Sequence, residues 1–156
     1  MKKGFYFSLL VMLCFSLMSS SCSNNDDDGG VIDNSEQIAQ VENTVESGTW
    51  RITNFIDSGE NETSDFAGYN FSFHSDGSLD ATNGTDTLTG TWSVTDDSSS
   101  IYDYIYFNIF FNIPDTNDFE DLNDDWDIVS YTSTRIELID ISGGNGGTDN
   151  LTFEKN

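Results

Sequence analysis

The sequence predicts an all-β domain: an antiparallel up-and-down barrel of about eight strands, preceded by one helix. From Thr49 onward, apolar and polar residues alternate with the period of two that is typical of half-buried strands. Turn signals recur at short intervals, and the single proline, Pro114, lies between two predicted strands. Alternation on one side only indicates a sheet with one wet face. Such a meander loses its edges most simply by closing on itself.

The first 21 residues predict a cleaved secretory signal. Met1-Lys2-Lys3 is a short basic start, an apolar stretch follows from Phe5 to Met18, and small residues lead into Cys22. The stretch is shorter than the roughly 20 apolar residues of a membrane-spanning helix. Small residues before a cysteine resemble the lipobox of bacterial lipoproteins. The resemblance implies that Cys22 is diacylated and that the lipid bilayer is a partner through this anchor.

Residues 22–34 predict a flexible acidic tether, because they are short, polar and contain a glycine pair. The run Ser-Asn-Asn-Asp-Asp-Asp after Cys22 resembles the acidic export signal that sends lipoproteins of the Bacteroidetes to the outer face of the outer membrane. A solvated spacer is the alternative. The expected location is therefore the cell outer membrane, with the choice between its two faces left open.

An amphipathic helix is predicted over residues 35–47. Ser35 is a suitable N-cap, Gly48 is a suitable stop, and the apolar residues fall at helical spacing: Ile38, Val41 and Val45. The helix contains no Lys or Arg, which argues against a role at the membrane surface.

The predicted strands follow over residues 48–156, and Asn83-Gly84 is a strong hairpin signal. Six strands show one-sided alternation, with these inward residues: Trp50, Ile52 and Ile56; Tyr69, Phe71 and Phe73; Leu79 and Ala81; Leu88, Trp92 and Val94; Ile136 and Leu138; Leu151 and Phe153. Segments 101–113 and 126–131 supply two more. Segment 101–113 is apolar on both faces, so we expect the helix to cover its second face. An exposed aromatic platform for sugar rings or a partner is the alternative.

Gly48-Thr49-Trp50, directly after the helix, matches the G-x-W signature of lipocalins. With the second Gly90-Thr91-Trp92, the segment Trp126-Asp-Ile128 and the closing strand, the chain resembles the small lipocalin-like lipoproteins of Bacteroidetes. The resemblance implies an eight-stranded barrel with one closed end and one open mouth. It also implies that Trp50 plugs the closed end and that Lys155 packs over it.

Charge and residue content exclude several functions. Cleavage removes Lys2 and Lys3 but no acid, which leaves three basic side chains against 28 acidic ones, a formal net charge of −25. Such a surface repels phosphate backbones, so nucleic-acid binding is excluded. Cys14 lies in the signal and Cys22 is acylated, so no thiol remains for a disulfide or for catalysis. His74 is the only histidine and faces outward without a nucleophile at a recognisable spacing. We therefore predict no catalytic residue and no cofactor.

Residues 115–127 hold seven acids and are expected to form a solvated loop between two strands. An EF-hand would need Gly where Glu120 stands and a bidentate Glu where Trp126 stands, so we predict no metal site. Calcium binding by this loop is the alternative. The glycine-rich segment 143–149 is expected to be a turn.

These features predict a monomeric, non-catalytic binding protein for a small apolar or amphipathic ligand held at the barrel mouth. The residues expected to bind it are aromatic and lie at inward or rim positions: Tyr69, Phe71, Phe73, Trp92 and Trp126. The alternative is a filled barrel that serves as a structural, partner-binding or glycan-binding module. Large side chains at most inward positions favour this alternative, since only small ones would leave a cavity.

Overall fold

The computed structural model describes residues 33–97, 104–142 and 147–156, which belong to one unit spanning Val31–Asn156. The predicted signal, Cys22 and most of the tether lie outside the described residues. The elements are α1 (Ser35–Glu46), β1 (Trp50–Asp57), β2 (Glu60–Asn61), the 3-10 helix η1 (Thr63–Phe66), β3 (Asn70–Phe73), β4 (Ser78–Thr82), β5 (Thr87–Asp96), β6 (Ile105–Phe110), the 3-10 helix η2 (Glu120–Leu122), β7 (Asp124–Thr132), β8 (Arg135–Ile141) and β9 (Thr148–Lys155).

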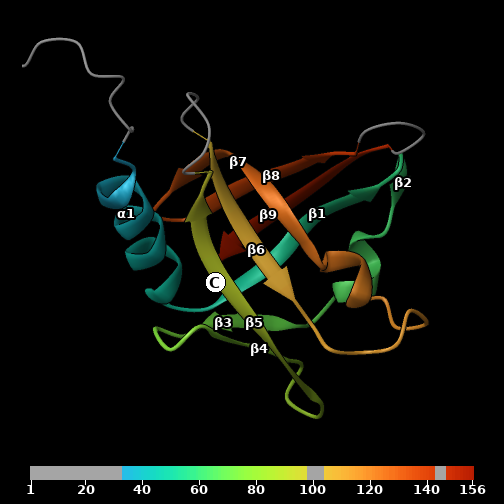
Figure 1. Ribbon diagram of the computed structural model, residues 1–156. Coiled ribbons are helices and arrows are strands. Elements are labelled where there is room, and N and C mark those ends of the chain that lie inside the picture. Colours follow the sequence, from blue (N-terminus) through green and yellow to red (C-terminus); the bar gives the residue numbers. More distant parts are fainter. Residues whose placement is uncertain (1–32, 98–103, 143–146) are drawn as a thin grey trace, which may run out of the picture. The chain divides into compact units, whose positions relative to one another are not determined.

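The strands form a closed antiparallel barrel (Figure 1). Each strand from β3 to β9 pairs with its neighbour in sequence, and β1 pairs with both β3 and β9. The β1–β9 ladder closes the barrel over six residue pairs, from Trp50 opposite Lys155 to Ile56 opposite Asn150. The short strand β2 pairs antiparallel with the end of β1 and lies outside the eight-stranded ring. The predicted all-β barrel with one helix is confirmed.

The helix begins at Ser35, so its N-cap lies one residue earlier than predicted. Asn34 is the N-cap, because its carbonyl accepts the first helical hydrogen bond, from the Ile38 N–H at 2.9 Å. Asp33 Oδ1 also accepts a hydrogen bond from the Ser35 N–H at 3.0 Å. The helix ends at Glu46 with Ser47 as its C-cap, and Gly48 turns the chain at a φ of +132° that side chains rarely adopt. No helix among the described residues is long and apolar enough to cross a membrane.

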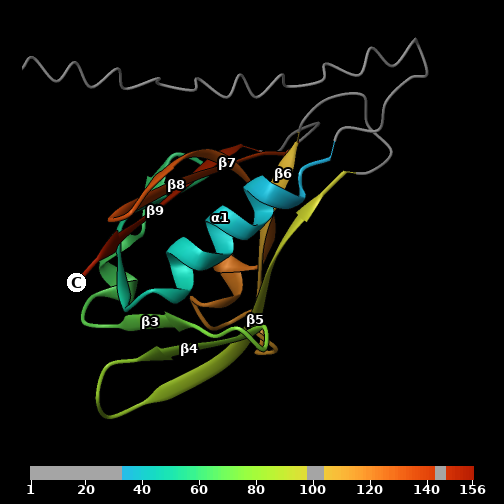
Figure 2. The ribbon, with the colours of Figure 1, turned by 90° about the vertical axis from the view of Figure 1, so that its left-hand side faces the viewer.

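The helix covers an end of the barrel and does not cover the second face of β6. Val41 and Val45 are fully buried, and the helix packs chiefly against β3 and β5 (Figure 2). The expectation that it shields β6 is therefore wrong. Tyr104 and Phe110 remain 48% and 54% exposed on the outer side of that strand. Ile101 and Tyr102, the first residues of the predicted apolar run, lie outside the described residues.

Trp50 plugs the end that the helix covers. Its side chain is fully buried, and Nε1 donates to the carbonyl of Val45 at 2.8 Å. Lys155 Nζ lies 5.2 Å from the centre of the indole ring and donates to Ser47 Oγ at 2.8 Å. This is the placement that the lipocalin resemblance implies. Gly48 leaves the space for it, since a Cβ there would stand 3.0 Å from Lys155 Cε.

Side chains from the connections fill the opposite end, where an open mouth is expected. Segments η1 and η2 lie away from α1 (Figure 1), and three buried side chains from this region close the barrel: Phe66, Phe119 and Leu122. Phe66 and Phe119 meet edge to face at 5.2 Å. Residues 115–127 are consequently not one solvated loop, because part of the segment forms η2 and β7 begins at Asp124.

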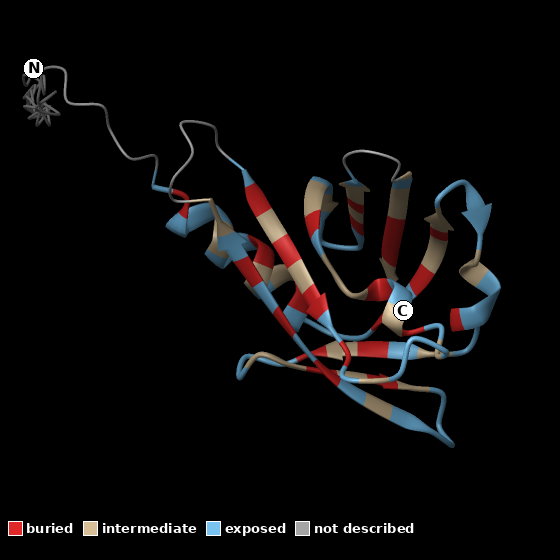
Figure 3. Cartoon of the chain, turned by 45° about the vertical axis from the view of Figure 1, so that its right-hand side comes forward, coloured by how far each residue is buried: buried red, intermediate tan, exposed pale blue. Residues whose placement is uncertain are grey.

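The interior is packed with aromatic rings. Along the strands, buried positions alternate with half-buried and exposed ones (Figure 3). The largest buried side chains include Trp50, Trp126, Phe55, Phe66, Phe71, Phe107, Phe111 and Phe153. Trp126, expected at an inward or rim position, is 1% exposed and donates through Nε1 to the carbonyl of Leu122. In the described part of the chain, the barrel core is therefore filled.

Candidate ligand-binding groove on the outer wall

The five aromatic residues predicted to bind a ligand lie in or against this core. Phe71, Phe73, Trp92 and Trp126 are buried, while Tyr69 is half-buried with its ring 4.8 Å from that of Phe119. These side chains contact one another and the rest of the core. Their packing role is shown, and a ligand-binding role for them stays a prediction.

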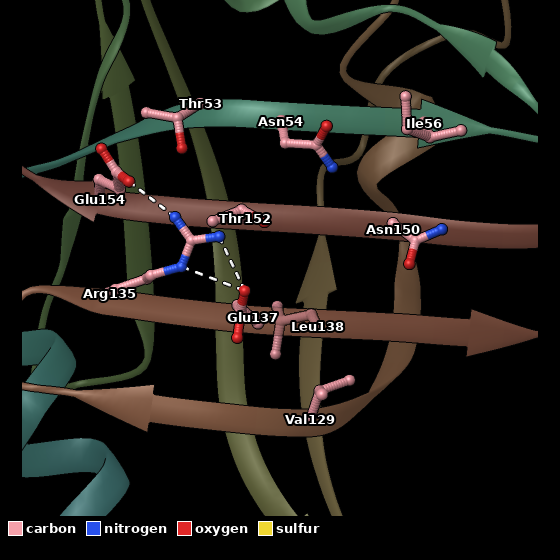
Figure 4. Close-up of a pocket in the computed structure, with 10 residues that line it drawn as sticks. All are labelled: Thr53, Asn54, Ile56, Val129, Arg135, Glu137, Leu138, Asn150, Thr152 and Glu154. Atoms are coloured by element: carbon pink, nitrogen blue, oxygen red, sulfur yellow. Dashed lines mark hydrogen bonds and ion pairs between the residues drawn. The ribbon is translucent and has the colours of Figure 1, made fainter.

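A groove of about 480 Å³ lies on the outer wall of the barrel, across β1, β9, β8 and β7 (Figure 4). Ten residues line it: Thr53, Asn54, Ile56, Val129, Arg135, Glu137, Leu138, Asn150, Thr152 and Glu154. Most of these side chains are polar, and they come from four neighbouring strands. The groove is therefore held by the rigid wall of the barrel and not by a loop.

Two β-bulges frame the groove. The register of β1 against β9 shifts between Ile52 and Asn54, and that of β7 against β8 shifts between Ile128 and Ser130. The extra residues are Thr53 and Val129, both of which line the groove. A bulge bends its strand and reorients the side chains that follow. We attribute the hollow of the wall to these two bends.

The bulge in β1 also corrects one sequence prediction. Strict alternation places Ile56 inward with Trp50 and Ile52. After the shift, Phe55 is the buried residue at 1% exposure, and Ile56 faces the groove. One extra residue thus moves every later side chain of the strand to the other face.

Strand register arranges the outward side chains in three rows. Across β1, β9 and β8, the first row is Arg51, Glu154 and Arg135; the second is Asn54, Thr152 and Glu137; the third is Ile56, Asn150 and Ile139. Directly opposed residues on one face of a sheet have their Cβ atoms about 5 Å apart. The groove therefore passes from a charged row through a polar row to a mixed amide and aliphatic row.

The charges of the first row and of Glu137, its neighbour in the second row, compensate each other. Arg135 Nη1 donates to Glu154 at 2.7 Å, and Arg135 Nη2 donates to Glu137 at 2.7 Å. Arg51 reaches the second oxygen of Glu154 at 3.5 Å. A hydrogen bond from Ser130, followed by those from Arg135, lowers the pKa of Glu137, so it stays ionised at neutral pH. Two arginines meet two glutamates here, which makes this region formally neutral on a very acidic chain.

Four polar side chains of the groove carry no hydrogen bond to the described part of the protein. They are Thr53, Asn54, Asn150 and Thr152, and all lie on the adjoining strands β1 and β9 (Figure 4). Each amide can donate two hydrogen bonds and accept two, and each hydroxyl can do both. Thr53, Asn54 and Asn150 are half-buried and Thr152 is only 6% exposed, so the three former residues present most of the neutral donors and acceptors of the groove.

Sequence reasoning missed the groove because its residues read as the ordinary wet face of strands. The arginines and glutamates alternate with core residues, which is typical of any half-exposed strand. One signal points to the bulge: Phe55-Ile56 places two large apolar residues side by side inside an alternating strand. The three rows form only because β1 pairs with β9 in a particular register. These are the first and last strands of the domain, and their register cannot be read from either segment alone.

His74 belongs to a separate cluster on the outer face of β3, β4 and β5. Its Nε2 lies 3.2 Å from Asp80 Oδ2, and Thr89 donates to Asp80 Oδ1 at 2.8 Å. His74 and Thr89 are exposed and Asp80 is half-buried. The Thr89 hydroxyl bonds to the carboxylate and not to the imidazole, so the arrangement lacks the nucleophile–base contact of a catalytic triad.

Carboxylates crowd the end of the barrel that η1 and η2 close. Loss of water around Asp124 raises its pKa to about 6, and the charges of Asp140 and Asp125 act in the same direction. Partial burial and neighbouring acids also raise the pKa of Glu62, Asp121 and Asp127. Within the described residues, no three His, Cys, Asp or Glu side chains are placed to hold a metal ion together.

Acidification from pH 7.5 to pH 5 should therefore stabilise the fold. A carboxyl whose folded pKa is raised binds its proton more tightly in the folded state, so its contribution is full below the unfolded pKa and is lost as pH rises through the folded value. For Asp124 this window runs from its ordinary 3.8 to about 6. The lowered pKa of Glu137 opposes the trend only below its ordinary 4.5. We expect a higher Tm at pH 5 than at pH 7.5 in thermal melts at constant ionic strength.

The variant Asp124→Asn should raise Tm at pH 7.5 and reduce the difference between the two pH values. The amide keeps an oxygen for the N–H of Asp125, which donates to Asp124 at 2.7 Å in the native protein. Asp86→Asn, at an exposed turn position, is the matched control and should keep the native pH dependence. An unchanged pH dependence in Asp124→Asn would show that Asp124 is not the responsible group.

Comparisons with known proteins assign no function to this chain. No protein-family model matches the sequence, and no curated protein matches it. Among solved structures, the chain is similar to the crystal structure of a DUF4847 family protein from Bacteroides vulgatus ATCC 8482, at 20% sequence identity and a TM-score of 0.47. The similarity covers 74% of this chain and 97% of that one. The function is therefore argued from the groove itself.

Proposed function

We propose that the protein is a membrane-anchored, non-catalytic binding module whose filled barrel carries a saccharide site on its outer wall. The observation that carries the proposal is the set of four neutral polar side chains, Thr53, Asn54, Asn150 and Thr152, which have no hydrogen-bond partner among the described residues. This is the glycan-binding alternative of the sequence analysis. The packed core favours it over a ligand held inside the barrel.

A neutral polyhydroxylated ligand fits this groove best. Amide and hydroxyl groups can pair with vicinal hydroxyls, which offer both donors and acceptors. The charged row is compensated together with Glu137, so these four residues offer no net attraction to an ionic ligand. The rest of the chain is strongly acidic and repels anions, which disfavours acidic glycans. Ile56 and Val129 provide aliphatic surface for the apolar face of a sugar ring.

The double variant Asn54→Ala/Asn150→Ala should weaken saccharide binding about tenfold or more, since each lost hydrogen bond contributes roughly 1 kcal/mol. The full-length mature protein in neutral detergent is first screened against neutral and acidic oligosaccharides. The best neutral ligand is then titrated by calorimetry. Both substitutions leave the charge unchanged, so electrostatic effects are held constant.

Asn43→Ala is the matched control, because it removes an exposed amide from α1 outside the groove. It should bind the saccharide as the native protein does. Equal affinity in the double variant, or binding only of acidic oligosaccharides, would contradict the proposal.

The anchor is a separate part of the proposal. It is supported by Cys22 following a basic, apolar and small-residue leader. Cys22→Ser should abolish labelling by a fatty-acid analogue and move the protein from the membrane fraction to the aqueous one. Cys14→Ser, within the predicted signal, is the control and should leave both unchanged. Membrane retention of the Cys22→Ser protein without acyl label would contradict a lipid anchor.

A further inference from the structure

The outer face of β6 is an exposed aromatic strip that neither the barrel core nor the groove uses. Tyr104, Tyr106 and Phe110 alternate on this face, and Tyr104 and Phe110 are 48% and 54% exposed. Tyr106 and Phe110 stand four residues apart, which is about 13 Å along a strand. Single exposed apolar residues are common, but a row on one strand face marks an interaction surface.

Carboxylates border this strip along β7. Asp127 lies directly opposite Tyr106, and Asp125 lies directly opposite Asn108, so both acids share the outer face with the aromatic rings. Partial loss of water raises the pKa of the Tyr106 hydroxyl, and the charges of Asp127, Asp97 and Asp125 raise it further. The ring of Tyr106 therefore lies in a negative potential.

No basic side chain of β5, β6 or β7 offsets this potential, because those strands contain no Lys or Arg. The nearest strand with an arginine is β8, where Arg135 is already paired with Glu137 and Glu154. On the other flank, β5 contributes the hydroxyls of Thr91, Ser93 and Thr95, which are neutral. The strip thus combines aromatic rings with uncompensated negative charge.

We propose that the outer face of β6, with Asp125 and Asp127 at its border, docks a basic segment of a partner protein. Guanidinium and ammonium groups are attracted to aromatic faces, and their charge also pairs with the bordering carboxylates. A second copy of this chain would bring the same acids to the contact and is disfavoured by like charge. A neutral sugar would make no use of the carboxylates' charge.

The test measures binding of a fluorescent peptide of alternating arginine and glycine to the full-length mature protein in neutral detergent. Fluorescence anisotropy at low salt should show saturable binding that weakens strongly in 0.5 M sodium chloride. Phe110→Ala, which changes no charge, should weaken binding about threefold to tenfold. Asp125→Asn/Asp127→Asn should weaken it at least as much.

A control of equal charge separates a site from general attraction to an acidic protein. Asp115→Asn/Asp118→Asn removes the same charge near η2 and should bind the peptide nearly as tightly as the native protein. The groove variant Asn54→Ala/Asn150→Ala should also bind it normally, which keeps this proposal independent of the saccharide site.

Three outcomes would overturn the proposal. The first is an equal loss in both double-aspartate variants, and the second is no loss in Phe110→Ala; either would leave only non-specific electrostatic binding. The third is binding at this face of a neutral oligosaccharide, or of a second copy of the chain in sedimentation, that Phe110→Ala abolishes. That result would assign the strip to a different occupant.

Discussion

Replacing Trp50 by alanine should lower the free energy of unfolding by about 3–5 kcal/mol, as expected for truncation of a fully buried aromatic side chain. The indole is completely shielded from solvent and is fixed by its hydrogen bond to Val45. Its loss removes one of the contacts between the barrel and the end of α1 and leaves the carbonyl of Val45 without that donor. The measurement is urea unfolding of the full-length mature protein in neutral detergent, followed by circular dichroism.

Phe110→Ala is the control, because it also truncates an aromatic side chain to alanine. Phe110 is also an aromatic residue on a barrel strand, but it is 54% exposed, so its loss should change stability far less. Trp50→Phe should fall between the native protein and Trp50→Ala, because a ring remains but the donor is lost. If Trp50→Ala costs no more than Phe110→Ala, then Trp50 does not close this end of the barrel.

Replacing Phe119 by alanine should cost a similar 3–5 kcal/mol and also open an apolar cavity in the other end. Phe119 is 4% exposed and its ring contacts those of Phe66, Tyr69, Phe71 and Phe111. Four aromatic neighbours cannot all collapse into the space it leaves. An apolar cavity of this kind stays dry and binds small aromatic molecules. Titration with benzene, followed by its effect on Tm, should therefore stabilise the variant and leave the native protein unchanged.

Phe119→Leu is the matched control, since it retains most of the side-chain volume and should neither lose as much stability nor bind benzene as well. Stabilisation of the native protein by benzene to the same degree as Phe119→Ala would mean that the interior already accepts apolar ligands. That outcome would restore the interior as the binding site and argue against the filled barrel.

Alternation was sufficient to predict the barrel, because each strand has one buried and one wet face. The buried sets on β3 and β8, Phe71 with Phe73 and Ile136 with Leu138, match the predicted inward residues. Alternation fails where an extra residue enters a strand. In β1 the bulge at Thr53 turns Phe55 into the core and Ile56 to the outer wall. The only sign of the bulge in the local sequence is that these two apolar residues are adjacent.

The two barrel ends show a different limit. The stripe of Val41 and Val45 predicts that the helix covers something, but the strand it covers depends on how the chain returns to β1. We expected β6, because an apolar second face usually needs a cover. In the structure, the helix packs on the barrel end instead, where Trp50 donates a hydrogen bond to the carbonyl of Val45 in its last turn. Phe66 and Phe119 likewise lie in connections, where no strand periodicity indicates an inward direction.

The groove could not be predicted because it depends on register between distant segments. Arg51 and Arg135 are separated by most of the barrel in sequence, yet both reach Glu154 on β9. The composition shows that basic residues are few, but it does not show that Arg51 and Arg135 lie together on the outer wall of the barrel. For β6, a covered second face and an exposed aromatic platform were both expected from the sequence, and the structure shows Phe110 exposed; the binding role of the platform stays a prediction.

The pairing of β1 with β9 has a consequence for how the chain acquires its structure. The first strand of the barrel finds its longest ladder only in the last residues of the chain, from Asn150 to Lys155. Contacts between distant segments form late, because the intervening chain must first be brought together. A growing polypeptide therefore cannot close the ring until its final strand has emerged from the ribosome. Until then β1 and β8 both lack β9 as a partner, so both edges of the unclosed sheet stay unpaired.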